Sequence, residues 1–266
     1  MPWLTSRRIK EPEDYKVAKY IVENTEYVAD YFPIEQAMDW LGDDGVVLDN
    51  LPHSPMQMLA IDWVGSEGGR FFYHLADYPD LVEDLYRALS RSRRAMYGIA
   101  AKSSAPITMC GDNVDGFLLS PRIFEKYFMP EYEEQAALLH KTGKLMAVHM
   151  DGRLASLKDL IAKTPIDIVE GFHPIPMGNL PLSEALAVWP DKATWIGFPG
   201  AIYELGVRAT EEFALTLLRE MGKGDRLAVA MSTENQVSNE NLLMIASVLE
   251  RAYLPLLGEV SEGTAR

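Results

Sequence analysis

Residues 144–152 read KLMAVHMDG and carry the pattern that decides the fold. Lys144–His149 is a short run of mainly apolar residues, too short for a helix and apolar enough to be buried on both faces. His149, Asp151 and Gly152 supply polar and turn-forming residues directly at its end. A buried strand that ends in a polar turn recurs along the second half of the chain.

Five runs of this kind predict strands. They are Pro106–Cys110, Lys144–His149, Ile166–Gly171, Ala193–Phe198 and Arg226–Met231. Amphipathic stretches predict helices between and after them, at Arg153–Lys163, Leu182–Val188, Thr210–Met221 and Ser238–Tyr253. Strands that alternate with helices in this way are typical of a parallel sheet, either closed into a barrel or doubly wound.

A further helix is predicted from Ser120-Pro121, because serine is a favoured N-cap and proline a favoured first helical residue. Its apolar stripe includes Phe124 and Tyr132 and stops at Gly143. Pro130 lies inside the stripe, so we expect a kink or a break there.

The first hundred residues give weaker signals. Gly45–Leu48 and Met58–Trp63 are weaker strand candidates, and Tyr78–Lys102 predicts a long helix. Seven strands result, whereas a (β/α)8 barrel of roughly 250 residues needs eight. No linker or repeat interrupts the sequence, so we predict a single TIM-type barrel domain over residues 1–266 that lacks or replaces its first strand.

Residues 1–55 form a divergent N-terminal segment in this prediction. They include a helix-prone stretch, Glu11–Glu23, and several aromatic residues. A barrel without its first strand leaves unpaired edges, which natural proteins cover. We predict that this segment closes the gap as an irregular plug, or that two chains pair across it as a homodimer.

The charge of the chain excludes some classes of partner. Its 25 Lys and Arg residues stand against 39 Asp and Glu residues, which gives a net charge of -14 and repels phosphate backbones and anionic headgroups. We expect no nucleic-acid or membrane partner and, since no apolar signal or spanning segment is evident, a cytoplasmic protein. Cys110 is the one cysteine, so nitrogen and oxygen atoms would supply most ligands of any metal.

Polar residues follow four of the predicted strands at the carboxyl ends, where barrel enzymes place their sites. They are Asp112 and Asn113, His149 and Asp151, Glu170, and Glu234 and Asn235. A barrel would bring Asp112, His149, Glu170 and Glu234 to one mouth.

His149 fits a metal ligand or a general acid/base, since imidazole binds zinc and titrates near neutral pH. The alternative is a histidine that is only hydrogen-bonded at a strand end. Glu170 ends an apolar strand, so it must be paired, protonated or metal-bound.

The other candidates also have structural alternatives. Asp112-Asn113 could bind substrate or cap the next segment, and Asp151-Gly152 is also a turn signal. Glu234-Asn235 is also typical of a solvated loop. His173 lies between prolines and is expected to brace a loop.

Several short segments occur in a recognisable order. They are Gly111-Asp112-Asn113, Ser120-Pro121 with Phe124 and Pro130, Gly143, His149-Met150-Asp151-Gly152, Asp167–Glu170, Pro174–Pro181, Trp195–Pro199 and Asn239–Asn241. In this order they resemble the uroporphyrinogen decarboxylase superfamily, which also contains the cobalamin-dependent methyltransferases. The resemblance covers about Met58 to Pro255 and implies a (β/α)8 barrel.

The methyltransferases of this superfamily hold zinc through a His-x-Cys pair and a later Cys. The resemblance places His149 and Asp151 at the pair, Glu234 near the later Cys and Glu170 at an acidic position of the family. Carboxylates thus replace both thiolates, which keeps the negative charge and makes the ligand set harder. The resemblance implies zinc or another divalent metal at His149, Glu170 and Glu234, catalytic roles for His149, Glu170 and Asp112, and substrate contacts from Asn113, Asp151 and Asn235.

We therefore expect a methyltransferase that moves a methyl group from an O- or N-methyl donor to a thiol or to a corrinoid on a partner protein. A carboxy-lyase resembling uroporphyrinogen decarboxylase is the first alternative. The last predicted strand, however, ends in Ser232–Asn235 without the histidine of those enzymes, and residues 1–35 lack their arginine-rich loop. The second alternative is a non-catalytic barrel subunit that binds a corrinoid protein.

Overall fold

The computed structural model describes residues 6–222, 224–231 and 237–252 and divides the chain into two compact units. Unit 1 comprises Met1–Asp112, Arg122–Val148 and Thr164–Ile166, and unit 2 comprises Asn113–Pro121, His149–Lys163 and Asp167–Arg266. Each unit combines parallel strands with helices, which confirms the α/β class. The single barrel domain over the whole chain stays a prediction.

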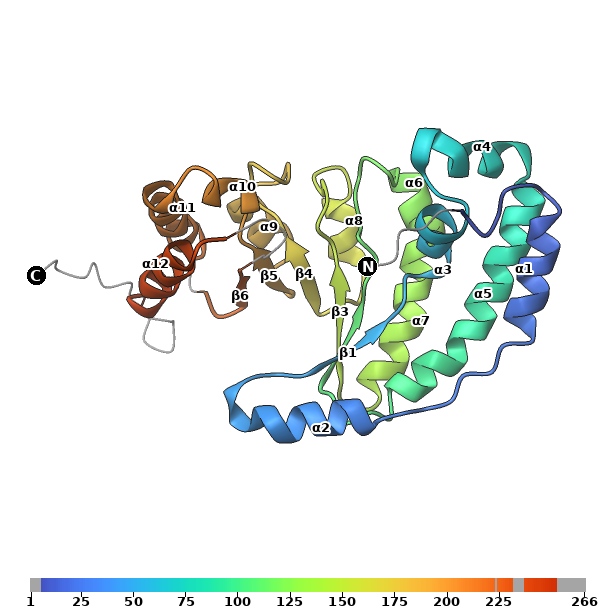
Figure 1. Cartoon of the computed structure of the whole chain (residues 1–266), viewed down its shortest axis with the longest axis horizontal. Helices are drawn as coiled ribbons and strands as arrows, with labels where there is room; N and C mark the ends of the chain where they lie inside the picture. Colours follow the sequence, from blue (N-terminus) through green and yellow to red (C-terminus); the bar gives the residue numbers. More distant parts are fainter. Residues whose placement is uncertain (1–5, 223, 232–236, 253–266) are drawn as a thin grey trace, which may run out of the picture. The chain divides into compact units, whose positions relative to one another are not determined.

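Three parallel strands form the sheet of unit 1: β1 (Leu48–Leu51), β2 (Ile107–Cys110) and β3 (Leu145–His149) (Figure 1). Their order follows the sequence, and β2 and β3 each begin one residue later than predicted. β1 begins where the predicted strand at Gly45–Leu48 ends, because residues 45–47, which follow the 3-10 helix η1 (Gly42–Asp44), belong to no strand.

The prediction of a strand at Met58–Trp63 is wrong. These residues form the π-helix η2 (Met58–Trp63), which continues α3 (Pro55–Gln57). Ser54-Pro55 starts this helix just as Ser-Pro pairs commonly do, with proline at the first position. Its buried apolar residues, Met56, Leu59, Ala60 and Trp63, are spaced as on one face of a helix.

A long helix, α5 (Pro79–Ala100), is central to the helical part of unit 1 and confirms the helix predicted at Tyr78–Lys102. Against it pack α1 (Asp14–Glu23) and α7 (Met129–His140), and Figure 1 shows α1 beside α5. Unit 1 also contains α2 (Phe32–Leu41), η3 (Glu67–Gly69) and α4 (Arg70–Asp77). The described part of residues 1–55 therefore contains two regular helices as well as β1.

The helix that begins at Ser120-Pro121 continues through Pro130, where a kink or a break was predicted, and its irregularity is a π-helical stretch before that proline. It runs through α6 (Pro121–Ile123), the π-helix η4 (Phe124–Phe128) and then α7. Proline has no N–H for the regular ladder, and a wider π turn before it accommodates that loss. Gly143 ends the segment at a φ of 77°.

Unit 2 contains β4 (Ile168–Phe172), β5 (Ala193–Gly197) and β6 (Leu227–Ala230), which pair in parallel with β5 in the middle. Its helices are α8 (Lys158–Lys163), α9 (Leu182–Val188), α10 (Gly200–Tyr203), α11 (Val207–Glu220) and α12 (Asn239–Glu250). α9 has its predicted bounds, whereas α8 begins five residues after the predicted Arg153, because residues 153–154 are irregular and residues 155–157 form a turn. Ser238 caps α12 by accepting the N–H of Asn241.

The described residues contain six parallel strands instead of the seven predicted, because Met58–Trp63 is helical. Three lie in each unit, and within each unit their order follows the sequence. In the described part of the chain, no helix is both long and apolar enough to cross a bilayer.

Candidate functional site

The predicted site residues fall into two groups, which belong to different units. His149, Asp151, Glu170 and Asn113 belong to unit 2, and Asp112 belongs to unit 1. Glu234 and Asn235 lie outside the described residues. The two described groups are therefore treated separately.

In unit 2 the imidazole of His149 lies between two carboxylates. His149 is the last residue of β3, and its Nδ1 makes a short hydrogen bond to Oε2 of Glu170. Its Nε2 faces Oδ2 of Asp151 at 3.6 Å. Both ring nitrogens are thus directed to acidic groups, and the ring orientation is fixed.

A bulge in β4 brings Glu170 to this position. The strand continues through Glu170 to Phe172, beyond the predicted end at Gly171, and its register shifts between Val169 and Phe172. Gly171 has a φ of 73°, and a Cβ atom there would lie 2.6 Å from Cε1 and Nδ1 of His149. Only glycine leaves room for the imidazole at this distance.

The two carboxylates control the charge of His149. Its polar contact with Asp151 and then its hydrogen bond with Glu170 outweigh burial and raise its pKa to about 10. Burial raises the pKa of Asp151, but the polar contact with His149 and the charge of that imidazole are stronger together and lower this pKa below its ordinary value. At neutral pH the imidazole is a cation held between acidic side chains.

Backbone hydrogen bonds fix the chain around this cluster. The N–H of Met150 donates to the carbonyl of Glu170 at 2.7 Å, and the N–H of Val114 donates to the carbonyl of His149 at 3.2 Å. Asn113, one residue earlier, has a φ of 45°. The segment after β2 that contains Asn113 is therefore tied to the end of β3 by the main chain.

His173 adds a second imidazole near the cluster. Its ring is buried, and neither nitrogen has a hydrogen-bond partner among the described residues. It is close enough to contribute to the lowered pKa of Asp151. Gly197 makes room for this ring, since a Cβ atom there would lie 2.6 Å from Nε2. His173 was expected to hold its loop in place, which it would do through hydrogen bonds from these nitrogens. Among the described residues, neither nitrogen makes such a bond.

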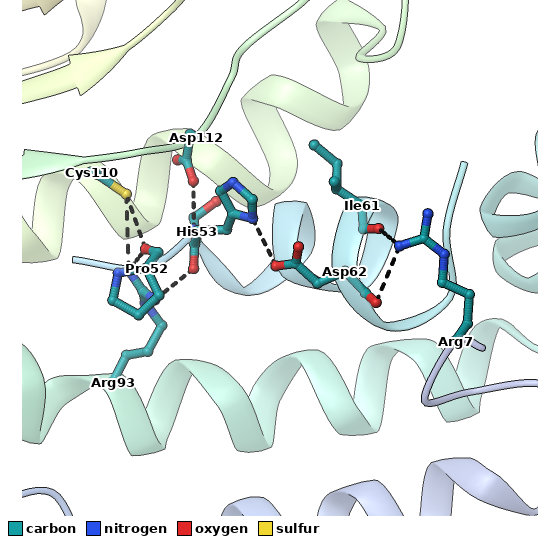
Figure 2. A network of polar contacts seen from close by, with 9 residues as sticks. Arg7, Pro52, His53, Ile61, Asp62, Arg93, Cys110 and Asp112 are labelled. Atoms are coloured by element: carbon teal, nitrogen blue, oxygen red, sulfur yellow. Dashed lines mark hydrogen bonds and ion pairs between the residues drawn. The ribbon is translucent and has the colours of Figure 1, made fainter. Parts of the chain in front are cut away.

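Asp112 is fully buried in unit 1 (Figure 2). Oδ1 accepts a short hydrogen bond from the backbone N–H of Ser54, and Oδ2 accepts one from the hydroxyl of Tyr132 at 2.7 Å. Both oxygens are therefore engaged by the protein, and they join the start of α3 to α7.

His53 was not predicted to belong to a site. It follows β1 and pairs through Nδ1 with Oδ2 of Asp62 in η2 at 2.7 Å (Figure 2). This hydrogen bond raises the pKa of His53 above its ordinary value against the opposing effect of burial. A histidine just after a strand is the same signal that drew attention to His149, but the predicted strand at Gly45–Leu48 ended too early to reveal it.

Arg93 holds the segment after β1 in place (Figure 2). It donates to the carbonyls of Pro52 at 2.9 Å and His53 at 2.6 Å, and it is itself buried. Its Nη2 lies 3.9 Å from Sγ of Cys110. Burial raises the pKa of this thiol well above its usual value, so Cys110 behaves as a core residue, as expected.

Among the described residues, no three His, Cys, Asp or Glu side chains are placed to hold a metal ion. His149 and Asp151 offer two donor atoms, and the implied third donor, Glu234, is outside that set. Comparison with protein-family models and with curated proteins finds no match for the chain.

Proposed function

We propose that this chain is a methyltransferase related to the uroporphyrinogen decarboxylase superfamily, with a divalent-metal site at His149 and Asp151. The observation that carries the proposal is the oriented imidazole of His149, whose Nδ1 bonds to Glu170 while Nε2 faces Asp151. The transfer of a methyl group is inferred from the ordered segments that resemble the superfamily.

The donor atoms fit a divalent metal in type and in spacing. Imidazole nitrogen and carboxylate oxygen bind zinc with bonds of about 2.0–2.2 Å, which puts neighbouring ligands of a tetrahedral ion about 3.3–3.6 Å apart. Nε2 of His149 and Oδ2 of Asp151 are separated by 3.6 Å. Glu234 is the third ligand that the resemblance implies.

Glu170 would act as a positioning residue for this pair. Histidine ligands commonly donate their other ring N–H to a carboxylate, which fixes the ring and makes it a better ligand. Glu170 is bonded to Nδ1 of His149 in this way. On this basis we propose that His149 and Asp151 contact the metal, and that Glu170 orients His149 instead of taking the ligand role implied by the resemblance.

A divalent ion bound here would act as a Lewis acid that polarises the oxygen or nitrogen atom bearing the methyl group. Asp151 and His149 would bind it, and His149 would release the proton that it carries at neutral pH. His173 offers a buried ring without a described partner, which a polar group of the substrate would satisfy.

The strand order supports a barrel as the parent fold. Six parallel strands occur in sequence order within their units, and helices separate consecutive strands along the chain. We propose that they correspond to strands of a (β/α)8 barrel, with the site at their carboxyl ends.

Elemental analysis and a methyl-transfer assay test this proposal together. The full chain is dialysed against zinc, washed, and assayed for methylcobalamin formation from cob(I)alamin with a panel of methoxy and methylamine donors. We expect about one metal ion per chain and transfer from at least one donor, both lost in His149→Gln. His140→Gln, at an exposed histidine of α7, is the matched control.

Two outcomes would overturn the proposal. A wild-type chain that retains no metal and transfers no methyl group would favour a non-catalytic subunit. Release of carbon dioxide from a porphyrinogen, with no methyl transfer, would favour the carboxy-lyase.

A further inference from the structure

β1 is the end strand of the sheet in unit 1. It pairs with β2 along its whole length, and no other described strand pairs with its opposite side. An edge strand presents main-chain N–H and C=O groups that can bind another extended chain. None of the four residues of β1, Leu48–Leu51, is a lysine or a proline that would protect this edge.

The pairing with β2 shows which main-chain groups of β1 point away from β2. Gly111 donates its N–H to the carbonyl of Leu51, so the peptide groups of Leu51 face β2. Because successive residues of a strand direct these groups to opposite sides, the N–H and C=O of Asn50 point away from β2. Asn50 is exposed, so a partner strand can reach these groups.

A cavity of about 460 Å³ lies along this edge. All four residues of β1 line it, together with the segment around Tyr31 and Ile34 and the end of α5 at Met96 and Ile99. The hydroxyl of Tyr31 donates to the carbonyl of Ile99 at 3.0 Å, which holds the opposite wall in place. The cavity is thus a groove with a strand edge on one side and mainly apolar side chains on the other.

The stretch of sequence that contains β1 and the segment around Tyr31 is acidic, and some of its apolar side chains are exposed. Between Lys19 and Arg70 the sequence contains ten Asp and Glu residues and neither lysine nor arginine. Asp30 lines the cavity, and Val28, Phe32 and Val46 are 84%, 66% and 54% exposed. A second copy of the chain would bring the same acidic charges together, whereas a basic segment would be complementary to them.

We propose that the free edge of β1 binds a basic, extended segment of a partner protein, which pairs with β1 as an added strand. Hydrogen bonds between the partner's main chain and the N–H and C=O of Asn50 provide the affinity, as in other cases of strand addition. Apolar side chains of the partner enter the groove. The partner's Lys or Arg side chains face Asp30 and other acidic residues between Lys19 and Arg70. This surface belongs to unit 1 and is separate from the residues of the proposed metal site.

Fluorescence anisotropy with a labelled peptide of alternating lysine and valine tests the proposal on the full chain. We expect saturable binding that weakens as salt is added, and at least tenfold weaker binding to a glutamate–valine peptide. The same lysine–valine peptide with every backbone N–H replaced by N–CH3 keeps its charge and side chains. It should not bind, because it cannot form the strand hydrogen bonds.

Two variants locate the site. Asn50→Pro removes the outward N–H of β1 and should abolish binding, while Asp30→Lys should weaken it several-fold. Asp225→Lys makes the same charge change at an exposed position in unit 2 and should leave the affinity unchanged. The methylated peptide keeps the test decisive if Asn50→Pro does not fold.

Three results would overturn the proposal. Equal binding of the methylated peptide would exclude strand addition, and failure of the unmodified peptide to bind would exclude a basic partner. Sedimentation showing a dimer of the chain that Asn50→Pro dissociates would mean that a second copy covers this edge.

Discussion

Asp112 is wholly buried, and its carboxylate holds two residues that are far from it in the sequence, Ser54 and Tyr132. Tyr132→Phe would remove one donor and leave a buried carboxylate oxygen without a partner, at a cost of about 1–3 kcal/mol of unfolding free energy. Urea denaturation measures this loss. Tyr20→Phe, at a tyrosine that is 68% exposed, is the control, and equal stability of the two variants would contradict the prediction.

The pair of His53 and Asp62 should make stability depend on pH. The hydrogen bond to Asp62 raises the pKa of His53 in the folded chain above its ordinary value of 6.5. The pair therefore stabilises the fold fully below pH 6.5, and this contribution is lost as the pH rises through the folded-state pKa.

Unfolding free energies of the wild-type chain and Asp62→Asn, measured between pH 5 and pH 9, test this dependence. We expect the difference between them to be largest near pH 5 and to shrink as the pH rises. A difference that stays constant over this range would show that proton binding by His53 is not the cause.

At the scale of elements, the bulge of β4 determines where His149 lies. Gly171→Ala would place a Cβ atom 2.6 Å from the imidazole ring and put alanine at a φ of 73°. Gly143→Ala imposes a similar φ of 77°, but its Cβ atom would meet nothing within 4 Å. In both variants the left-handed backbone conformation of alanine should lower the free energy of unfolding by roughly 1–2 kcal/mol.

The difference between the two glycine variants isolates the contact with His149. Thermal or urea unfolding should show Gly171→Ala to be the less stable of the two, and Gly171→Ala alone should shift the ring resonances of His149 in an NMR spectrum. Equal stability together with an unchanged His149 spectrum would mean that the imidazole does not depend on this glycine.

The sequence predicted elements well where local signals agree. Short apolar runs with polar ends predicted β2 and β3 nearly to the residue, and the amphipathic segment Leu182–Val188 predicted α9. The strand predicted at Met58–Trp63 was wrong because a short apolar run fits a strand or a buried helix equally well. The Ser54-Pro55 pair before it was the local signal for a helix.

The candidate site was predictable only in part. The strand-end pattern selected His149, Asp151 and Glu170, which lie together in unit 2. It could not show that Asp112 binds Tyr132 and Ser54, because those contacts span 20 and 58 residues of sequence. Tertiary contacts of this length leave no local pattern.

At the scale of the whole molecule, the N-terminal segment contributes to the core of unit 1. α1 buries Tyr15, Ala18 and Val22 and packs against α5. The hydroxyl of Tyr15 lies 3.1 Å from Nδ1 of His74 in α4, and the N–H of Ile9 donates to the carbonyl of Trp63 at 2.9 Å. These contacts bind the segment to three other elements of the unit.

Deletion of Met1–Tyr31 should therefore loosen unit 1, because α5 would lose the helix that covers part of its apolar face. We expect a truncated chain that aggregates or binds a hydrophobic dye and unfolds without a sharp transition. Tyr15→Ala tests the same contact within the full chain and should cost about 3–5 kcal/mol, as for other large buried aromatic residues, whereas Val17→Ala, at a residue that is 61% exposed, should cost little. A truncated chain that is monomeric, free of dye and cooperatively folded would show that the segment is a dispensable tail.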